Sequence, residues 1–173
     1  MNMKNCRNII LAAAVLVAAS SCSDKVQIKG TIAGAPDTQV VVKQLNGGAL
    51  VALDTVKTDG KGAYSYSVEV LKGQPQFIYL YKGDTKVASL LLQKGDKVKV
   101  ASDTLGKYSV EGSAESELLR QVEEDFAAFL DKFTADAARG DNAAASKDYI
   151  DYYKGRVKFI MENAKSLTAI PVL

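Results

Sequence analysis

The chain has 173 residues, with 22 lysines and arginines against 20 aspartates and glutamates, two cysteines, no histidine and no tryptophan. The lack of histidine excludes Ser-His-Asp and Cys-His nucleophiles and histidine-ligated metal sites. The near balance of charge gives no basis for nucleic-acid binding, because nucleic-acid binders concentrate basic charge on one face.

The first 24 residues indicate where the protein resides. Lys4 and Arg7 precede the apolar run Ile9–Ala19, and small residues lead up to Cys22. This order is typical of a secretory signal, and the run is shorter than the roughly 20 residues of a membrane-spanning helix. Cys22 after Ala-Ser-Ser resembles the cysteine of a bacterial lipoprotein signal, which receives a diacylglycerol and becomes the new N-terminus. The alternative is an ordinary secreted protein in which Cys22 has no role.

Cleavage before Cys22 would remove the signal peptide, residues 1–21, and leave 173 − 21 = 152 residues, which suits one domain with a small appendage. Lys4 and Arg7 leave with the signal, so the mature part has 20 basic and 20 acidic residues. Cys6 also leaves, so no cysteine pair remains for a disulfide or a Cys-x-x-Cys centre. We therefore expect no catalytic residue, no cofactor and no metal site in this chain.

Residues 22–112 are predicted to form a lipid-anchored β domain. Short runs of alternating or β-branched residues are separated by turn residues such as glycine, proline and aspartate. About seven such strands, spaced about ten residues apart, are typical of an antiparallel β-sandwich or an open barrel. The runs lie within Val26–Ile32, Gln39–Leu45, Leu50–Leu71 (two runs), Gln76–Lys82, Lys86–Gln93, Asp96–Ser102 and Lys107–Glu111.

The turn residues also predict pairings. Pro36-Asp37 predicts that the first two strands form a hairpin, and Asp59-Gly60 predicts a second hairpin between the strands on either side of it. In Gln76–Lys82 the aromatic residues alternate with Ile78 and Leu80, so both faces are apolar. That pattern predicts a central strand.

From Gly112 the apolar period changes to that of a helix. Ser113 or Ser116 can cap a first helix, and a second is expected from about 146 to 164, so residues 113–165 should form an antiparallel helical hairpin. The expected apolar stripes are Leu118, Leu119, Val122, Phe126, Phe129, Leu130 and Phe133 on the first helix, and Ile150, Tyr153, Val157, Ile160 and Ala164 on the second. The apolar tail 166–173 has no charge, so we expect it to be buried and to begin a further segment.

Four sets of residues are candidates for a site. Asp54, Asp59, Asp84 and Asp96 could act as an acid/base pair or bind calcium, but three of them adjoin glycine and are interpreted as turn residues. A hydrolase using Asp54 and Asp59 is accordingly disfavoured. An aromatic set in the β region could form a stacking surface or could consist of core residues and cross-strand pairs: Tyr64, Tyr66, Phe77, Tyr79 and Tyr81. A set on the second helix could be a partner-binding face or a buried stripe: Tyr149, Tyr152, Tyr153 and Arg156. The acidic run Glu123-Glu124-Asp125 is interpreted as a solvated face.

Four segments carry a family likeness: Lys25–Ala33, Leu53–Tyr66, Leu92–Val100 and Tyr108–Ser113. Together they resemble a β-rich domain of unknown function, the domain-of-unknown-function 4369 type, of Bacteroidota lipoproteins. The resemblance implies a module placed between a lipid anchor and a thioredoxin-like domain of the AhpC/TSA or redoxin type. The thioredoxin-like part and its Cys-x-x-Cys centre are absent from this sequence, so the resemblance implies no catalytic residue here.

The leading hypothesis is a lipid-anchored accessory module of the cell envelope, periplasmic or outer-membrane, that forms the non-catalytic N-terminal part of a thiol-disulfide oxidoreductase lipoprotein. It would hold and orient a redox domain or its substrate, and enzyme activity is expected only if a thioredoxin-like domain follows. The alternative is a complete small lipoprotein that binds a ligand or an envelope protein through its β domain. The expected partners are the membrane, through lipid on Cys22, and a redox domain or envelope protein, with no nucleic acid.

Overall fold

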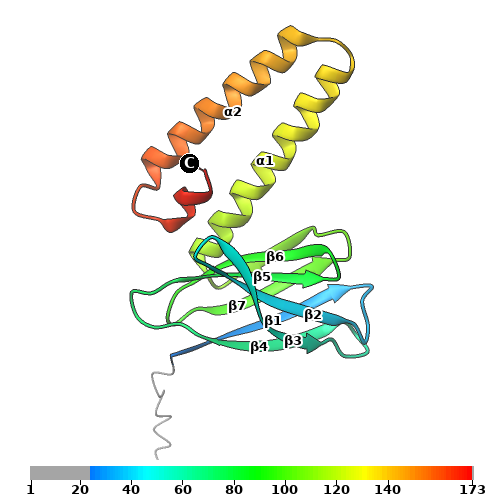
Figure 1. Ribbon diagram of the computed structural model, residues 1–173, viewed down its shortest axis with the longest axis vertical. Coiled ribbons are helices and arrows are strands. Elements are labelled where there is room, and N and C mark those ends of the chain that lie inside the picture. The colour runs from blue at the N-terminus through cyan, green and yellow to red at the C-terminus, as the bar shows by residue number, and fades with distance from the viewer. Residues whose placement is uncertain (1–23, 173) are drawn as a thin grey trace, which may run out of the picture.

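The computed structural model describes residues 24–172 as a β-sandwich that carries a helical hairpin (Figure 1). One sheet has the strand order β4-β1-β7-β8 and the other β3-β2-β5-β6, and the two sheets do not close into a barrel. The prediction of a mainly β sandwich with appended helices is confirmed. The strands are β1 (Lys25–Ala33), β2 (Gln39–Asn46), β3 (Ala49–Lys57), β4 (Ala63–Glu69), β5 (Gln76–Lys82), β6 (Thr85–Leu92), β7 (Lys97–Asp103) and β8 (Tyr108–Glu111).

The core lies between the sheets and is built from alternate residues of the strands. On β1, Val26, Ile28 and Ile32 are buried while the residues between them, apart from Gly30, are exposed. Such alternation buries one face of a strand and leaves the other for solvent. Ile78 and Leu80 of β5 are completely buried, and β5 lies between β2 and β6. The predicted central position of this strand is therefore confirmed.

The two predicted hairpins are wrong. β1 pairs with β4 and runs parallel to β7, whereas β2 pairs with β3 and β5. The connections after β1 and β3 therefore both cross from one sheet to the other. They bond to each other instead of closing hairpins: the N–H of Ile32 donates to the carbonyl of Gly62, and the N–H of Thr58 donates to that of Thr38. Local turn chemistry does not determine which sheet the next strand joins, and the parallel β1–β7 pair also departs from the expected all-antiparallel pattern.

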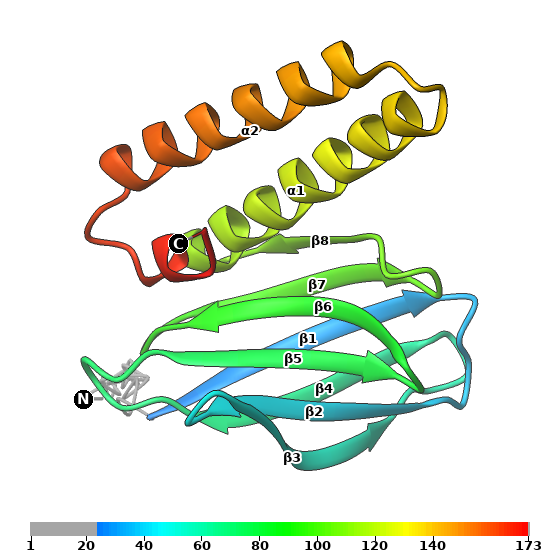
Figure 2. The same cartoon turned by 45° about the horizontal axis from the view of Figure 1, so that its top comes forward.

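Helix α1 (Ala114–Ala138) begins against the edge of the sandwich, where Figure 2 shows it above β6 and β8. Ser113 is its cap, since its side chain accepts the N–H of Ser116. The Ser116 hydroxyl accepts the N–H of Leu91 and donates to its carbonyl, both at 3.1 Å. Leu91 lies on the edge strand β6, so Ser116 satisfies the backbone groups that an edge strand otherwise leaves unpaired. The first turn of α1 is thus fixed to the sheet.

Helix α2 (Asn142–Glu162) runs back along α1, and the predicted antiparallel hairpin is confirmed. Asp141 caps α2 by accepting the N–H of Ala144, so the helix begins four residues before the expected position 146. The short helix η1 (Leu167–Val172) follows. Within it Thr168 and Ala169 are buried, and the Thr168 hydroxyl donates to the carboxylate of Glu115 at 2.9 Å, which ties this segment to the first turn of α1.

The expected buried stripe of α2 is wrong. Ile150, Tyr153 and Val157 are 42 to 57% exposed, whereas Tyr152 packs against α1 with its ring 4.3 Å from that of Phe129 and nearly parallel to it. The face of α2 that lies against α1 instead contains Tyr152 together with the buried residues Ala145 and Asp148, and Asp148 pairs with Lys132 of α1. Ile150, Tyr153 and Val157 therefore face solvent.

Removal of one buried hydroxyl should stabilise the core. Tyr64 is 6% exposed, its hydroxyl has no hydrogen-bond partner among the described residues, and burial raises the pKa of this phenol. A buried polar group without a partner costs about 1 to 3 kcal/mol. We expect Tyr64→Phe to raise the free energy of unfolding in urea by about 1 kcal/mol, while Tyr66→Phe, on a half-buried neighbour, leaves it unchanged. A loss of stability in Tyr64→Phe would contradict this account.

Candidate functional site

The four aspartates considered from the sequence do not form a cluster. The carboxylate of Asp59 accepts the N–H groups of Lys61 and Ala63 within its own turn, and these bonds hold its pKa below the usual value. Asp96 accepts the N–H of Gln93 in the turn before β7, and Asp54 accepts the N–H of Thr55 within β3. The interpretation of Asp59 and Asp96 as turn residues is confirmed. Cys22, the predicted lipidation residue, lies outside the described residues.

The aromatic group of the β domain is divided between the two sheets. Tyr64 and Tyr66 belong to β4, where Tyr64 is part of the core and Tyr66 packs against it. Phe77, Tyr79 and Tyr81 belong to β5 and are half-buried on the outer face of the other sheet. These five residues therefore cannot form one stacking surface, and the core and cross-strand interpretation holds for Tyr64 and Tyr66.

The most connected polar cluster surrounds Glu123 of α1, where the helix crosses the sandwich edge. One carboxylate oxygen of Glu123 accepts from the Lys86 ammonium at 2.6 Å and from the Ser89 hydroxyl at 2.7 Å. The other oxygen accepts from the Tyr108 hydroxyl at 3.0 Å. The three partners come from β6 and β8, so this cluster, here named the Glu123 network, joins α1 to one edge strand of each sheet.

The electrostatics of the Glu123 network keep its phenol protonated. Burial raises the pKa of Tyr108, and the neighbouring Glu123 carboxylate raises it further. Burial and then Glu123 also raise the pKa of Tyr79, whose ring lies 5.9 Å from the Lys86 ammonium. Ser89 is completely buried, and both Glu123 oxygens accept hydrogen bonds. Such an arrangement fixes α1 to the sandwich, and it has neither an activated nucleophile nor a free base.

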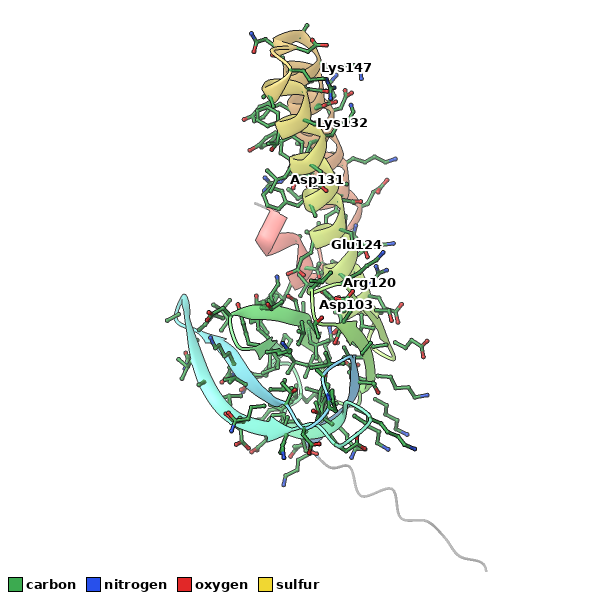
Figure 3. All side chains as sticks on the ribbon, turned by 90° about the vertical axis from the view of Figure 1, so that its right-hand side faces the viewer. Asp103, Arg120, Glu124, Asp131, Lys132 and Lys147 are labelled. Atoms are coloured by element: carbon green, nitrogen blue, oxygen red, sulfur yellow. The ribbon has the colours of Figure 1, made fainter. Side chains whose placement is uncertain are left out.

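The assignment of Glu123 to a solvated face is wrong. The Glu123 side chain is 27% exposed, while its neighbour Glu124 pairs with Arg120 on the helix surface. Figure 3 shows Arg120 and Glu124 on α1 near Asp103, at the base of the hairpin. The single polar residue in the apolar run Val87–Leu92 is Ser89, and it was the one signal in the sequence that a polar partner crosses β6.

A second ionic cluster joins the two helices. Asp148 of α2 is 6% exposed and pairs with Lys132 of α1, and Asp136 of α1 is 5% exposed and pairs with Arg139. The hydrogen bond from Lys132 holds the pKa of Asp148 below its usual value, and burial acts in the opposite direction. This cluster connects the upper part of the hairpin, where Figure 3 places Lys132.

Loss of Lys132 should destabilise the helical hairpin at neutral pH and make its stability less dependent on acid. A carboxyl group whose pKa is lower in the folded than in the unfolded state stabilises the fold above its unfolded pKa of about 3.9, and this contribution is lost as the pH falls through the folded pKa. Lys132→Met removes the main cause of the lowering and leaves the burial. We expect Lys132→Met to be less stable than the wild type at neutral pH, and this difference to disappear as the pH falls through the folded pKa of Asp148. Urea unfolding followed by circular dichroism at a series of pH values measures the difference. Lys158→Met, which removes an exposed pair with Glu162, should match the wild type at neutral pH, and a loss in Lys132→Met that is the same at every pH would contradict this assignment.

The exposed stripe of α2 is the main apolar surface of the hairpin. We name Tyr149, Ile150, Tyr153 and Val157 the α2 stripe; they are 48, 49, 42 and 57% exposed. They line a shallow groove of about 410 Å³, and the rings of Tyr149 and Tyr153 lie 4.4 Å apart. Of the predicted partner-binding set, Tyr149 and Tyr153 lie on this stripe and Tyr152 is turned toward α1, with Arg156 between Tyr152 and Tyr153.

Two further observations concern the part of the chain that the structure describes. Within residues 24–172, no group of three or more cysteines, aspartates and glutamates is placed to hold a metal ion. Neither α1 nor α2 contains a stretch that is both long and apolar enough to cross a membrane.

Comparison with protein families matches residues 26–119 to a domain of unknown function, DUF4369. The match covers 94 of the 173 residues, more than half of the chain. The chain belongs to this family. Apart from Lys25, the first residue of β1, the matched region contains the eight strands that the structure describes, and it ends at Leu119, a buried residue of α1. A search of curated proteins found no match.

Proposed function

We propose that the protein is a lipid-anchored accessory module of the cell envelope, the non-catalytic N-terminal part of a thiol-disulfide oxidoreductase lipoprotein. Three features support the proposal: the lipoprotein-like signal ending at Cys22, the DUF4369 sandwich, and the resemblance to modules that precede a thioredoxin-like domain. In this role the sandwich is the base, and the helical hairpin holds the redox domain away from it.

The single observation that carries the interaction role is the exposure of the α2 stripe. Its residues recur at intervals of three and four positions, so they form one continuous face of the helix. Contiguous exposed apolar surface marks sites where proteins bind one another. The opposite face of α2 packs against Phe129 and forms an ion pair with Lys132, both on α1. The α2 stripe is therefore available to another domain, which we propose is the thioredoxin-like domain.

The Glu123 network is consistent with such a holding role. A hairpin that presents a partner must keep a fixed direction relative to its base. α1 is attached to the sandwich by the Ser116 bonds to β6 and, about two turns later, by Glu123. Two attachments along one helix prevent it from pivoting about a single point.

The first test is mass spectrometry of the endogenous protein from the membrane fraction, with its terminal peptides identified. We expect an N-terminal Cys22 that carries a diacylglycerol, and a chain longer by a domain of about 100 to 150 residues that contains a Cys-x-x-Cys peptide. An unmodified N-terminus would overturn the anchoring. A chain that ends at Leu173 would overturn the connection to a redox domain.

A second candidate function, a complete small lipoprotein that binds a partner through the β module, is favoured by a different surface. β3 is an edge strand, and Leu50, Val51 and Leu53 on it are 40 to 47% exposed. An exposed apolar edge strand accepts an added strand from another protein. This surface lies on the sandwich, far from the α2 stripe in the fold (Figure 1).

Site-specific photo-crosslinking in cells distinguishes the two candidates. A photoreactive residue at Val157 tests the α2 stripe, one at Val51 tests the β3 edge, and one at Ser67, an exposed residue of β4, is the control. The leading proposal expects a crosslink to a thioredoxin-like domain from position 157. A crosslink from position 51 alone favours the alternative, and equal products from all three positions would count against both.

A further inference from the structure

The outer face of the β4-β1-β7-β8 sheet carries a concentration of lysines that the overall charge conceals. Beyond Cys22 the sequence has 20 basic and 20 acidic residues. Six of the lysines nevertheless line one shallow depression of about 700 Å³, which we name the lysine face. They are Lys25, Lys29, Lys72, Lys94, Lys97 and Lys99.

The register of the sheet brings like charges together. β1 and β7 are parallel neighbours, with Lys29 opposite Lys99 and Gln27 opposite Lys97. The sequence has no acidic residue between Lys25 and Thr31 or between Lys97 and Ala101. Like charges directly opposite each other on neighbouring strands are destabilising. Anionic groups bound over Lys29 and Lys99 would offset that repulsion.

The carboxylates near the lysine face lie at its margin. Lys94 pairs with Asp24, and Asp96 uses its carboxylate for the N–H of Gln93. Glu69 on β4 lies opposite Lys25, and Glu111 on β8 lies opposite Lys99. Lys29, Lys97 and Lys99 form the centre of the lysine face, and of these three Lys99 alone has a carboxylate, that of Glu111, directly opposite it in the neighbouring strand.

The lysine face lies next to the predicted point of attachment. Lys25 is both the first residue of β1 and part of the depression. Cys22 precedes it by three residues, which span at most about 11 Å even when fully extended. If Cys22 carries lipid, Lys25 is held within about 11 Å of the point of attachment, a distance comparable to the Debye length of about 8 Å at physiological salt. The lysine face then begins close to the membrane surface, where lysines are attracted to anionic lipids.

We propose that the lysine face docks on the anionic lipid headgroups of the membrane to which Cys22 is attached. The inference rests on the proposed anchoring and adds to it a fixed orientation, with the β4-β1-β7-β8 sheet against the membrane. The use of lysine favours binding to many anionic headgroups over binding to one defined phosphate. No arginine lines the depression. Arginine is the residue that binds a single phosphate in bidentate fashion, whereas lysines act as separate point charges on flexible side chains.

The test measures lysine protection in the complete, acylated protein reconstituted into vesicles. One set of vesicles contains phosphatidylcholine alone and the other phosphatidylcholine with phosphatidylglycerol; a water-soluble amine-acylating reagent then labels exposed lysines, and mass spectrometry reads each position. We expect Lys29, Lys97 and Lys99 to be labelled several-fold more slowly in the anionic vesicles, and this difference to disappear in concentrated salt. Lys147, Lys154 and Lys158 of α2 should be labelled equally in both. Equal labelling of the lysine face in both vesicles would overturn the proposal.

Two triple variants with the same change in net charge test whether the charge of the lysine face, and not only its closeness to the lipid anchor, causes the protection. The triple variant Lys29→Gln, Lys97→Gln, Lys99→Gln should abolish the protection of Lys25 and Lys72, whereas Lys147→Gln, Lys154→Gln, Lys158→Gln, with the same change in charge, should preserve it. The same mass spectra report the acyl group on Cys22. Acylation without protection therefore overturns the docking alone. An unacylated protein overturns the anchoring, and sedimentation of that protein with the anionic vesicles then decides whether the lysine face binds headgroups by itself.

Discussion

Gly112→Ala is expected to lower the free energy of unfolding by about 3 kcal/mol or more, and in the extreme to prevent folding. Gly112 joins β8 to α1 with a φ of +83°, and a Cβ built there would lie 2.1 Å from the carbonyl oxygen of Lys97. A side chain at such a φ costs about 1 to 3 kcal/mol, and forced overpacking costs a similar amount. The opposing atom belongs to the backbone, and the N–H of Lys97 donates to the Gly112 carbonyl. The two backbone segments therefore cannot move apart without breaking this hydrogen bond. Urea unfolding followed by circular dichroism measures the loss.

Gly73→Ala is the matched control for this substitution. Gly73 has a φ of +75°, and a Cβ there would meet no atom within 4 Å. Its cost should be the conformational part alone, about 1 to 2 kcal/mol. The difference between the two variants isolates the contact with Lys97. Equal losses would contradict the close approach of β7 to the start of α1.

The features of the fold that could be predicted from the sequence are those with a local cause. The alternation around Ile78 and Leu80 predicts a strand that is apolar on both faces, and the structure places it inside its sheet. The sequence also indicates a capping serine before α1 and the turn at Asp59, since both depend on side chains bonding to nearby backbone. Each of these follows from residues less than about ten positions apart.

The pairing of the strands has a different kind of cause. β1 pairs with β7 about 70 positions later, and no turn residue between them specifies that neighbour. The close approach of Gly30 to Tyr64 is a consequence of the β1–β4 pairing, because a Cβ at Gly30 would overlap the Tyr64 ring. The need for glycine at position 30 therefore depends on a residue 34 positions later in the sequence.

The candidate surfaces also depend on contacts between residues that are distant in the sequence. Ser89 and Tyr108 are polar residues of separate strands, and they form a network only because α1 brings Glu123 to both. On α2 the face that packs against α1 contains the buried Asp148, so the apolar period does not mark this face. The contacts of Tyr152 with Phe129 and of Asp148 with Lys132 determine which face lies against α1.

Glu123→Ala is expected to lower the free energy of unfolding by about 2 kcal/mol and to loosen α1 from the sandwich. The substitution removes the acceptor of the Lys86 ammonium, the Ser89 hydroxyl and the Tyr108 hydroxyl. Hydrogen bonds to a charged group contribute about 1.5 to 3 kcal/mol, and the buried Ser89 hydroxyl loses its Glu123 partner. Amide hydrogen exchange should therefore accelerate in α1 between Ser116 and Glu123, while exchange in β5 should follow only the global loss of stability.

Glu124→Ala is the control, because it removes a neighbouring carboxylate of the same helix whose pair with Arg120 lies at the surface. An exposed pair of this kind contributes about 0.3 to 0.5 kcal/mol. Glu123→Gln should recover part of the stability, since the amide oxygen still accepts one of the hydrogen bonds without the charge. If Glu123→Ala and Glu124→Ala gave the same small loss, α1 would be fixed by Ser116 and Leu119 alone, and the Glu123 network could not account for the direction of the hairpin on which the proposed presentation of the α2 stripe depends.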